Sequence, residues 1–409
     1  MIPALAWRNV RRNVRRSLLT AATVVIGVAL ATVALAWMDG VFASLFDAGA
    51  RQMGHVRVVT EAFAAREELA PLDAALPDAA SLAERVQRLT GVERVAPRIG
   101  QPVTVTVGET IGDTFALAVS APVAWFDEVL RLPDDLVAGA GFSGAGEGEL
   151  VVGGVVADQA GAELGDRVLI LGQTRDGALA PVEGKLVGIV RTGTAIVDQA
   201  VFVPLAAGQW MADLGPGASE LLVYGASRDD ALGLAATVRD ALKGEGFVVQ
   251  AWSEREPLAS MSGVIGAVRA VVAGLVILLC ALAVWNTMSM SVRERTAEIG
   301  VLRALGLRRR DIVGLFVLEG VAIALLGGAV GVVLGGAAGT YLEVVGVSIG
   351  EQVTQNTPLP IQTTLYADMN ATVAATGLLV ALLTALVGTA LPAIAAAAVP
   401  PVEAMRARR

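Results

Sequence analysis

The chain has 409 residues, of which 55% are hydrophobic and 17% charged, a composition typical of a membrane protein with a sizeable polar domain. Its net charge of −8 is unevenly distributed: residues 39–262 hold 31 acidic and 16 basic residues, and the remainder holds 8 acidic and 15 basic ones. This asymmetry argues against nucleic-acid binding. It fits an acidic outer domain joined to a basic membrane and cytoplasmic portion, as the positive-inside rule predicts.

The first 17 residues form a basic segment that we expect to be amphipathic and cytoplasmic. Its arginines are Arg8, Arg11, Arg12, Arg15 and Arg16. Residues 18–38 carry no charge, a length sufficient to cross ~30 Å of hydrocarbon, so we predict a first transmembrane helix at 18–39. A cleaved signal peptide is the alternative, but its apolar region would be shorter and no small-residue cleavage motif follows Met38. We therefore expect an uncleaved anchor.

Residues 40–262 are predicted to form an outer α+β domain. Strand, helix and strand follow one another twice, at 55–60, 81–89 and 94–98, and again at 220–224, 229–242 and 247–251. Ser81 and Glu84 match a capping box for the first helix. Between these two βαβ-like units we predict a β-rich insertion at about 120–215, with strands at 168–171, 186–190 and 201–203. His55 is expected to cap or orient the first strand.

Three more transmembrane helices are predicted at 263–290, 313–341 and 371–396, the last bent or ended near Pro392. The loop 342–370 contains acids but no lysine or arginine, which places it outside, and the tail 397–409 is expected in the cytoplasm. The chain is thus predicted to cross the membrane four times with both termini cytoplasmic.

The third span has glycines at every fourth position, which lie on one helical face and allow another helix to approach closely. They are Gly327, Gly331, Gly335 and Gly339. We expect this face to support assembly of two such membrane subunits, the alternative being the general glycine enrichment of membrane helices. Glu319 lies near the start of the same span, where it either reaches the headgroups or pairs with a buried arginine.

The segment 291–312, between the second and third spans, combines many arginines with an apolar stripe at helical spacing. A solvated positive-inside loop is one interpretation, and a helix that docks a cytoplasmic partner is the other. A loop that serves topology alone needs no apolar stripe, so we favour docking. The candidate coupling residues are Arg293, Glu294, Glu298, Ile299, Gly300, Leu302, Arg303, Leu305 and Gly306. Ile299, Leu302 and Leu305 are expected to enter an apolar groove, with Glu298 and Arg303 at its rim.

Three stretches resemble the FtsX/MacB/LolC–LolE family of ABC transporter permeases. They are ERTAEIGVLRALGLRRRDIVGLFVLEG from Glu294, GIVRTGTAIVDQAVFVPLAAGQ from Gly188, and the amino-terminal LAWRNVRRNVRRSLLTAATVVIGVAL followed by Gly54-His55-Val56; the ending PPVEAMR is also similar. The resemblance implies that the short loop helix sits in a groove of an ATPase subunit. It also implies an outer domain made of a porter part and an inserted β-rich sabre part.

Within that family, four spans and an outer domain of about 220 residues are most similar to the lipoprotein-releasing LolC/LolE type. MacB-type pumps carry their ATPase ahead of the first span, where this sequence has seventeen residues. The resemblance therefore implies a separate ABC ATPase, which would bind ATP and Mg²⁺, and a second permease that is either a copy or a paralogue. The resemblance also implies a location in the bacterial inner membrane, with the large domain in the periplasm. Membrane lipid and a lipoprotein or periplasmic protein are the other expected partners.

The sequence offers no catalytic site of its own. The nearest approach to a P-loop, Gly177 to Leu186, has six residues between its glycines and leucine after Lys185. One histidine and one cysteine, Cys280, make a metal site, a Cys/His dyad or an intrachain disulfide hard to build. Acidic pairs such as Asp134–Asp135 are expected in solvated loops. We predict a protein that is not an enzyme and binds no cofactor itself.

The predicted function is that of a permease subunit that couples ATP hydrolysis by a separate ATPase to motion of the outer domain, in lipoprotein release or export. One alternative is an FtsX-like permease that transmits a mechanical signal to a cell-wall hydrolase. Another is a membrane-anchored receptor or adhesion protein without ATPase coupling. The sequence does not name the cargo.

Overall fold

The computed structural model describes residues 14–108, 110–192, 194–256, 258–348, 364–398 and 400. The chain divides into a helical unit, made of Met1–Ala43, Gly263–Val347 and Leu365–Arg409, and a globular unit, made of Ser44–Ser262 and Ser348–Thr364. Most of the predicted basic segment (1–13), the middle of the loop (349–363) and the end of the tail (401–409) lie outside the described residues.

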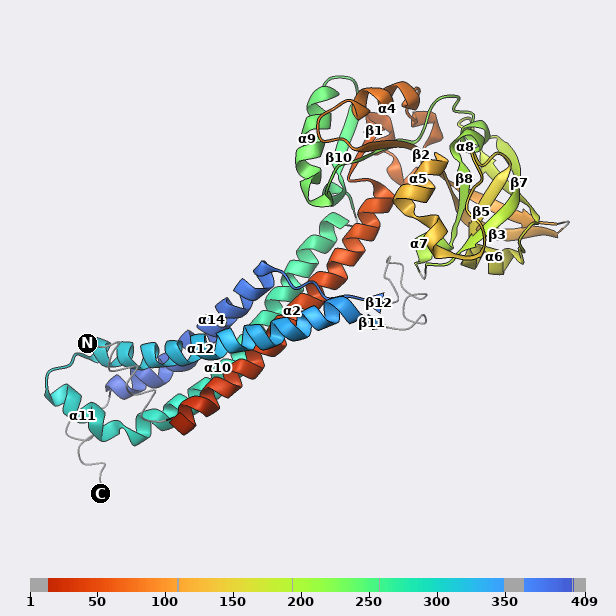
Figure 1. Cartoon of the computed structure of the whole chain (residues 1–409). Coiled ribbons are helices and arrows are strands. Elements are labelled where there is room, and N and C mark those ends of the chain that lie inside the picture. Colours follow the sequence, from red (N-terminus) through yellow and green to blue (C-terminus); the bar gives the residue numbers. More distant parts are fainter. Residues whose placement is uncertain are drawn as a thin grey trace. The chain divides into compact units, whose positions relative to one another are not determined.

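Four long helices form the helical unit (Figure 1): α2 (Val14–Met53), α10 (Leu258–Glu294), α12 (Arg309–Val345) and α14 (Ala371–Ala398). Each is long and apolar enough to cross a membrane, by length and composition, which confirms the four predicted spans. One buried cluster joins all four helices through residues such as Val28, Val284, Ile323 and Ala381. Arg269 of α10 pairs with Asp39 of α2 at 2.8 Å. Pro392 lies inside α14, which continues to Ala398.

The first helix is longer than its predicted span. Instead of ending at residue 39, α2 continues to Met53, and the globular unit begins within it at Ser44. Leu45 and neighbouring apolar residues keep helical spacing, and Gly54 then takes a left-handed backbone (φ 77°). A glycine in this conformation is a common helix stop, since it has no Cβ to clash.

The glycine face of α12 packs against α2 of the same chain. All four glycines of the face are buried. A Cβ added to Gly331 would lie 2.8 Å from the carbonyl oxygen of Val25, and one on Gly335 would lie 2.6 Å from that of Ala29. The predicted close helix packing is therefore present, but the neighbour was predicted wrongly: α2 fills the face, so these glycines are not open to a second permease.

The globular unit contains ten strands and seven short α-helices, besides several single 3-10 or π turns, among its described residues. The strands are β1 (Val56–Thr60), β2 (Arg94–Val107), β3 (Thr110–Ala121), β4 (Leu136–Gly139), β5 (Glu149–Gly153), β6 (Arg167–Gln173), β7 (Leu179–Val190), β8 (Ala200–Pro204), β9 (Glu220–Tyr224) and β10 (Phe247–Ala251). The helices are α3 (Glu61–Ala64), α4 (Ala79–Gln87), α5 (Val123–Trp125), α6 (Gly154–Ala160), α7 (Ala195–Asp198), α8 (Leu205–Ala212) and α9 (Ala231–Ala241). A separate pair, β11 (Val347–Ser348) and β12 (Thr364–Leu365), forms a two-stranded ladder.

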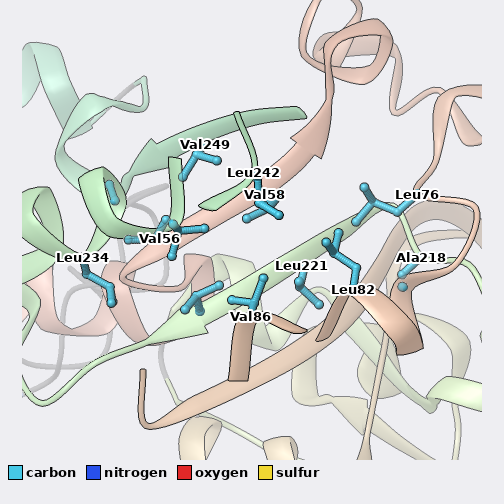
Figure 2. Packing of buried hydrophobic residues seen from close by; sticks show 14 of the residues in the cluster. Val56, Val58, Leu76, Leu82, Val86, Ala218, Leu221, Leu234, Leu242 and Val249 are labelled. Carbon is cyan, nitrogen blue, oxygen red and sulfur yellow. The ribbon is translucent and has the colours of Figure 1, made fainter. Parts of the chain in front are cut away.

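The first lobe of this unit has the strand order β10-β1-β9-β2, with every neighbouring pair antiparallel. The two strands of each βαβ unit therefore lie on either side of one strand of the other unit. This is the split arrangement that the repeated strand–helix–strand order predicts. Apolar side chains of the strands, such as Val58 and Leu221, meet Val86 of α4 and Leu234 of α9 in one core (Figure 2). The N-cap of α4 is Asp78, which accepts a hydrogen bond from the N–H of Ser81, so the predicted cap at Ser81 is wrong.

The second lobe is the predicted β-rich insertion, and it begins earlier than residue 120. Residues 94–98 of β2 pair with β9 of the first lobe, whereas its residues from Ile99 onward pair with β3. Strand β2 thus runs through both lobes, and the β2–β3 hairpin belongs to the insertion. The predicted strands at 168–171, 186–190 and 201–203 lie within β6, β7 and β8. β6 alternates buried and less buried residues, as a strand with one covered face should.

Candidate functional site

The loop between α10 and α12 contains a short helix, α11 (Thr296–Ala304), within the predicted coupling segment. The chain leaves α10 at Glu294, and Gly306 beyond α11 has a left-handed backbone (φ 96°). Asp311 then accepts a hydrogen bond from the backbone N–H of Arg308 at 3.0 Å, which satisfies one free N–H at the start of α12. The segment is therefore an ordered helix with defined turns on both sides.

The inner face of α11 packs against its own bundle. Ile299 is only 3% exposed and lies in a cluster with Phe316 of α12 and Ala396 of α14. Gly300 beside it is also buried. The expectation that Ile299 enters a partner's groove is therefore wrong, because helical spacing gives the position of an apolar stripe but not which protein covers it.

A buried ion pair joins the start of this loop to the third long helix. Nη1 of Arg295 donates to both carboxylate oxygens of Glu319, at 3.2 and 3.0 Å, and the two side chains are 8% and 6% exposed. This settles the two interpretations of Glu319 in favour of the arginine partner. Sequence reasoning did not single out Arg295. The feature that could have pointed to it is Glu319, a lone acid inside an apolar helix, which needs a basic partner nearby.

Arg303 ties the other end of α11 to α14. Its Nη1 donates to the carbonyl oxygen of Ala397 at 3.3 Å, where the negative end of a helix dipole favours a cation. Leu302 and Arg303 are both half-buried. Both side chains are therefore partly covered by the bundle. Arg303, which was predicted to lie at the rim of a partner's groove, also bonds to α14 of its own chain.

The outer face of α11 and its following turn combine apolar and charged side chains. Leu305 is 76% exposed and Val301 is 49% exposed. Arg293, Glu294 and Glu298 are also exposed, as is Gly306. Most of the predicted coupling residues are therefore exposed, and so is Val301, which sequence reasoning missed although it lies four residues before Leu305.

In the globular unit, side chains hold the last carbonyl groups of α2. The hydroxyl of Tyr224 donates to the carbonyl oxygen of Arg51 at 2.8 Å, and Nη1 of Arg255 donates to that of Met53 at 3.1 Å. Arg98 donates to the carbonyl oxygen of Gln52. These carbonyls have no partner within the helix, so the three bonds fix its terminal turn.

The side chain of His55 holds the residue that follows β9, not the first strand that it was predicted to cap or orient. Its Nδ1 accepts a hydrogen bond from the N–H of Gly225 at 3.2 Å, and its ring meets the Tyr224 ring edge-on. Burial lowers the pKa of His55, so the neutral imidazole that can accept this bond is the favoured form.

Two family models match this chain. The model described as MacB-like periplasmic core domain matches residues 17–241, more than half of the sequence, and the model described as FtsX-like permease C-terminal matches residues 270–401. The chain belongs to the MacB/FtsX family of ABC transporter permeases. The second match contains α11, so the loop helix lies in the part that this permease shares with its family.

Named relatives and solved structures show similarity of different extent. The permease is 26% identical over 358 residues to the pyoverdine export ATP-binding/permease protein PvdT of Pseudomonas entomophila, covering 80% of this chain and 50% of that protein. It is 33% identical over 98 residues to the macrolide export ATP-binding/permease protein MacB of Brucella abortus, covering 24% of this chain and 15% of that one. The chain thus spans half or less of the length of these curated relatives. The periplasmic region of MacB from Actinobacillus actinomycetemcomitans is 14% identical with a TM-score of 0.37, over 53% of this chain and 95% of that structure.

Proposed function

We propose that this permease couples ATP hydrolysis by a separate cytoplasmic ATPase, docked on α11, to motion of its globular domain, in lipoprotein release from the inner membrane or export at it. The observation that carries the proposal is α11 itself. It presents exposed apolar side chains on one face while its other face is packed into the bundle. The working assembly would hold two permeases and two ATPases.

The outer face of α11 is suited to a partner of complementary shape. Full burial of a side chain such as Val301 or Leu305 contributes about 1.5–3 kcal/mol. Ion pairs at the rim, from residues such as Glu298, contribute only about 0–1 kcal/mol each while they remain solvated. The apolar pair would therefore supply most of the docking energy, and the charges would set orientation.

The inner face of α11 is suited to transmitting a push. Ile299 is packed among α12 and α14 residues, Arg295 is bonded to Glu319, and Arg303 is bonded to the end of α14. A displacement of α11 would thus move these helices instead of bending a loose loop. The chain enters the globular unit through α2 and leaves it through α10, and side chains of that unit hold the terminal carbonyls of α2.

The test is a double substitution on the outer face, Val301→Asp with Leu305→Asp. Both side chains are exposed, so the permease should fold and insert normally while ATPase copurification and permease-dependent ATP hydrolysis fall at least tenfold. The matched control is Arg310→Asp, which adds an acid on an exposed residue in the first turn of α12, outside α11. If the double variant retains its ATPase, α11 is not the docking helix and the proposal fails.

Orientation is tested by labelling single cysteines in a Cys280→Ala background. A cysteine at Ser143 in the globular unit should react with a membrane-impermeant maleimide added outside intact cells. One at Ala297 of α11 should react only after permeabilisation. Labelling of Ala297→Cys from outside would refute both the topology and the docking of a cytoplasmic ATPase.

A further inference from the structure

The globular unit contains a cavity of about 350 Å³ with one charged wall and one apolar wall. Its volume is within the range of pockets that hold small molecules. The charged wall has three arginines and two glutamates: Arg57, Arg98, Arg255, Glu67 and Glu220. The apolar wall includes Leu117, Val119, Leu130 and Phe202. Leu117 and Ile196, which also lines the cavity, are both exposed, so the apolar side opens to solvent.

The charged residues bond to one another but do not neutralise one another. Arg57 donates to Glu67 through two bonds of 2.5 and 2.7 Å, and Arg98 donates to Glu220 at 2.7 and 2.9 Å. The third arginine, Arg255, lies 3.5 Å from Glu67, which Arg57 already engages. The wall therefore carries three positive and two negative groups, an excess of one positive charge.

Glu220, Glu67 and Arg255 are ionised near neutral pH. Burial would raise the pKa of Glu220, but the Arg98, Arg255 and Arg57 guanidiniums outweigh it and lower that pKa. The hydrogen bonds from Arg57 lower the pKa of Glu67. Burial lowers the pKa of Arg255 to about 10, which leaves its guanidinium protonated. The positive excess is thus present under physiological conditions.

The same wall has polar atoms that lack a hydrogen-bond partner among the described residues. They are Nε of Arg57, Nε of Arg255, Oγ of Ser219 and the carboxylate oxygen Oε2 of Glu220. These atoms have almost no accessible surface, so they do not face the cavity. The case for a ligand therefore rests on the net charge of the wall, whose excess of one positive charge favours an anion.

We propose that this cavity binds an anionic amphiphile, with its carboxylate or phosphate beside Arg57, Arg98 and Arg255 and its apolar chain along Leu117, Val119 and Phe202. At about 30 Å³ per water-sized group, the cavity holds about a dozen non-hydrogen atoms. That is the size of a medium-chain fatty acid, and a longer chain would extend past the exposed Leu117. Binding here needs no ATPase, so this inference can fail or hold independently of the proposed coupling through α11.

The test uses the full chain in phosphatidylcholine nanodiscs and three photoactivatable probes with a diazirine on the chain: decanoic acid, decyl phosphate and decanol. Crosslinked residues are mapped by mass spectrometry. We expect the two anionic probes to label the apolar wall at least tenfold more than decanol. Preferential labelling by the phosphate would identify a lipid-type headgroup as the natural ligand, and preferential labelling by the carboxylate a free fatty acid.

Variants at the mouth and wall of the cavity sharpen this test. Leu117→Glu should reduce labelling by the anionic probes at least fivefold, whereas Leu117→Lys should retain it; both change an exposed residue and should leave the fold intact. Arg255→Gln should also lower labelling, and the control Arg85→Gln, which changes an exposed arginine paired with Glu245, should not. Equal labelling by decanol, no labelling of the apolar wall, or equal effects of Leu117→Glu and Leu117→Lys would each overturn the proposal.

Discussion

Replacing Glu319 by alanine should destabilise the helical unit by about 3–5 kcal/mol. Glu319 accepts two hydrogen bonds from the buried Arg295, and its removal leaves that guanidinium in the bundle without its carboxylate. Two charge-assisted bonds at about 1.5–3 kcal/mol each give a similar figure. Arg295→Met combined with Glu319→Leu removes both charges and keeps the space filled, so the double variant should recover most of the lost stability.

The chain provides its own reporter for this experiment. Cys280 is its one cysteine, and it is buried on α10. A maleimide dye that fluoresces on reaction therefore reports thermal unfolding of the helical unit. At about 2–4 °C per kcal/mol, Glu319→Ala should lower the apparent Tm by about 6–20 °C. Glu343→Ala, an exposed acid on the same helix, should change it little. If the double variant is as unstable as Glu319→Ala, charge imbalance is not the cause and the reasoning is refuted.

Three further predictions concern packing, protonation and capping. Gly335→Ala should lower the stability of the helical unit by about 1–3 kcal/mol, because its Cβ would meet the backbone of Ala29. Gly314→Ala, which has open space around it, should raise that stability by up to about 1 kcal/mol through helix propensity. Equal Tm shifts for the two variants would contradict this. Because burial depresses the pKa of His55 below 6.5, the unfolded chain takes up its proton first, so stability should fall as pH drops below about 6.5. His55→Gln should remove that slope in denaturant unfolding of the globular unit, and an unchanged slope would assign it to other groups. Asp78→Ala should cost about 1 kcal/mol in the same assay through loss of the α4 cap, and no change would show that the cap is dispensable.

The sequence alone determined the features that depend on composition and local order. Four long uncharged runs require four membrane-spanning helices, since only such runs match the thickness of the hydrocarbon core. The repeated strand–helix–strand order predicted the split α+β lobe, and strands such as β9 and β10 lie at their predicted residues. The density of arginines beside an apolar stripe was sufficient to locate α11, and the motif from Glu294 was sufficient to identify the family.

Only the tertiary structure decided which neighbour covers each apolar face. Ile299 and Leu305 belong to the same stripe, yet the bundle buries one and leaves the other exposed. The glycine face of α12 would look the same in sequence whether it met α2, another permease or lipid, because all three are apolar neighbours. The exchange of partners within β2, the pairing of Arg295 with Glu319 and the gathering of three arginines around one cavity likewise join residues far apart in the chain. Such contacts depend on long-range packing, which local periodicity does not encode.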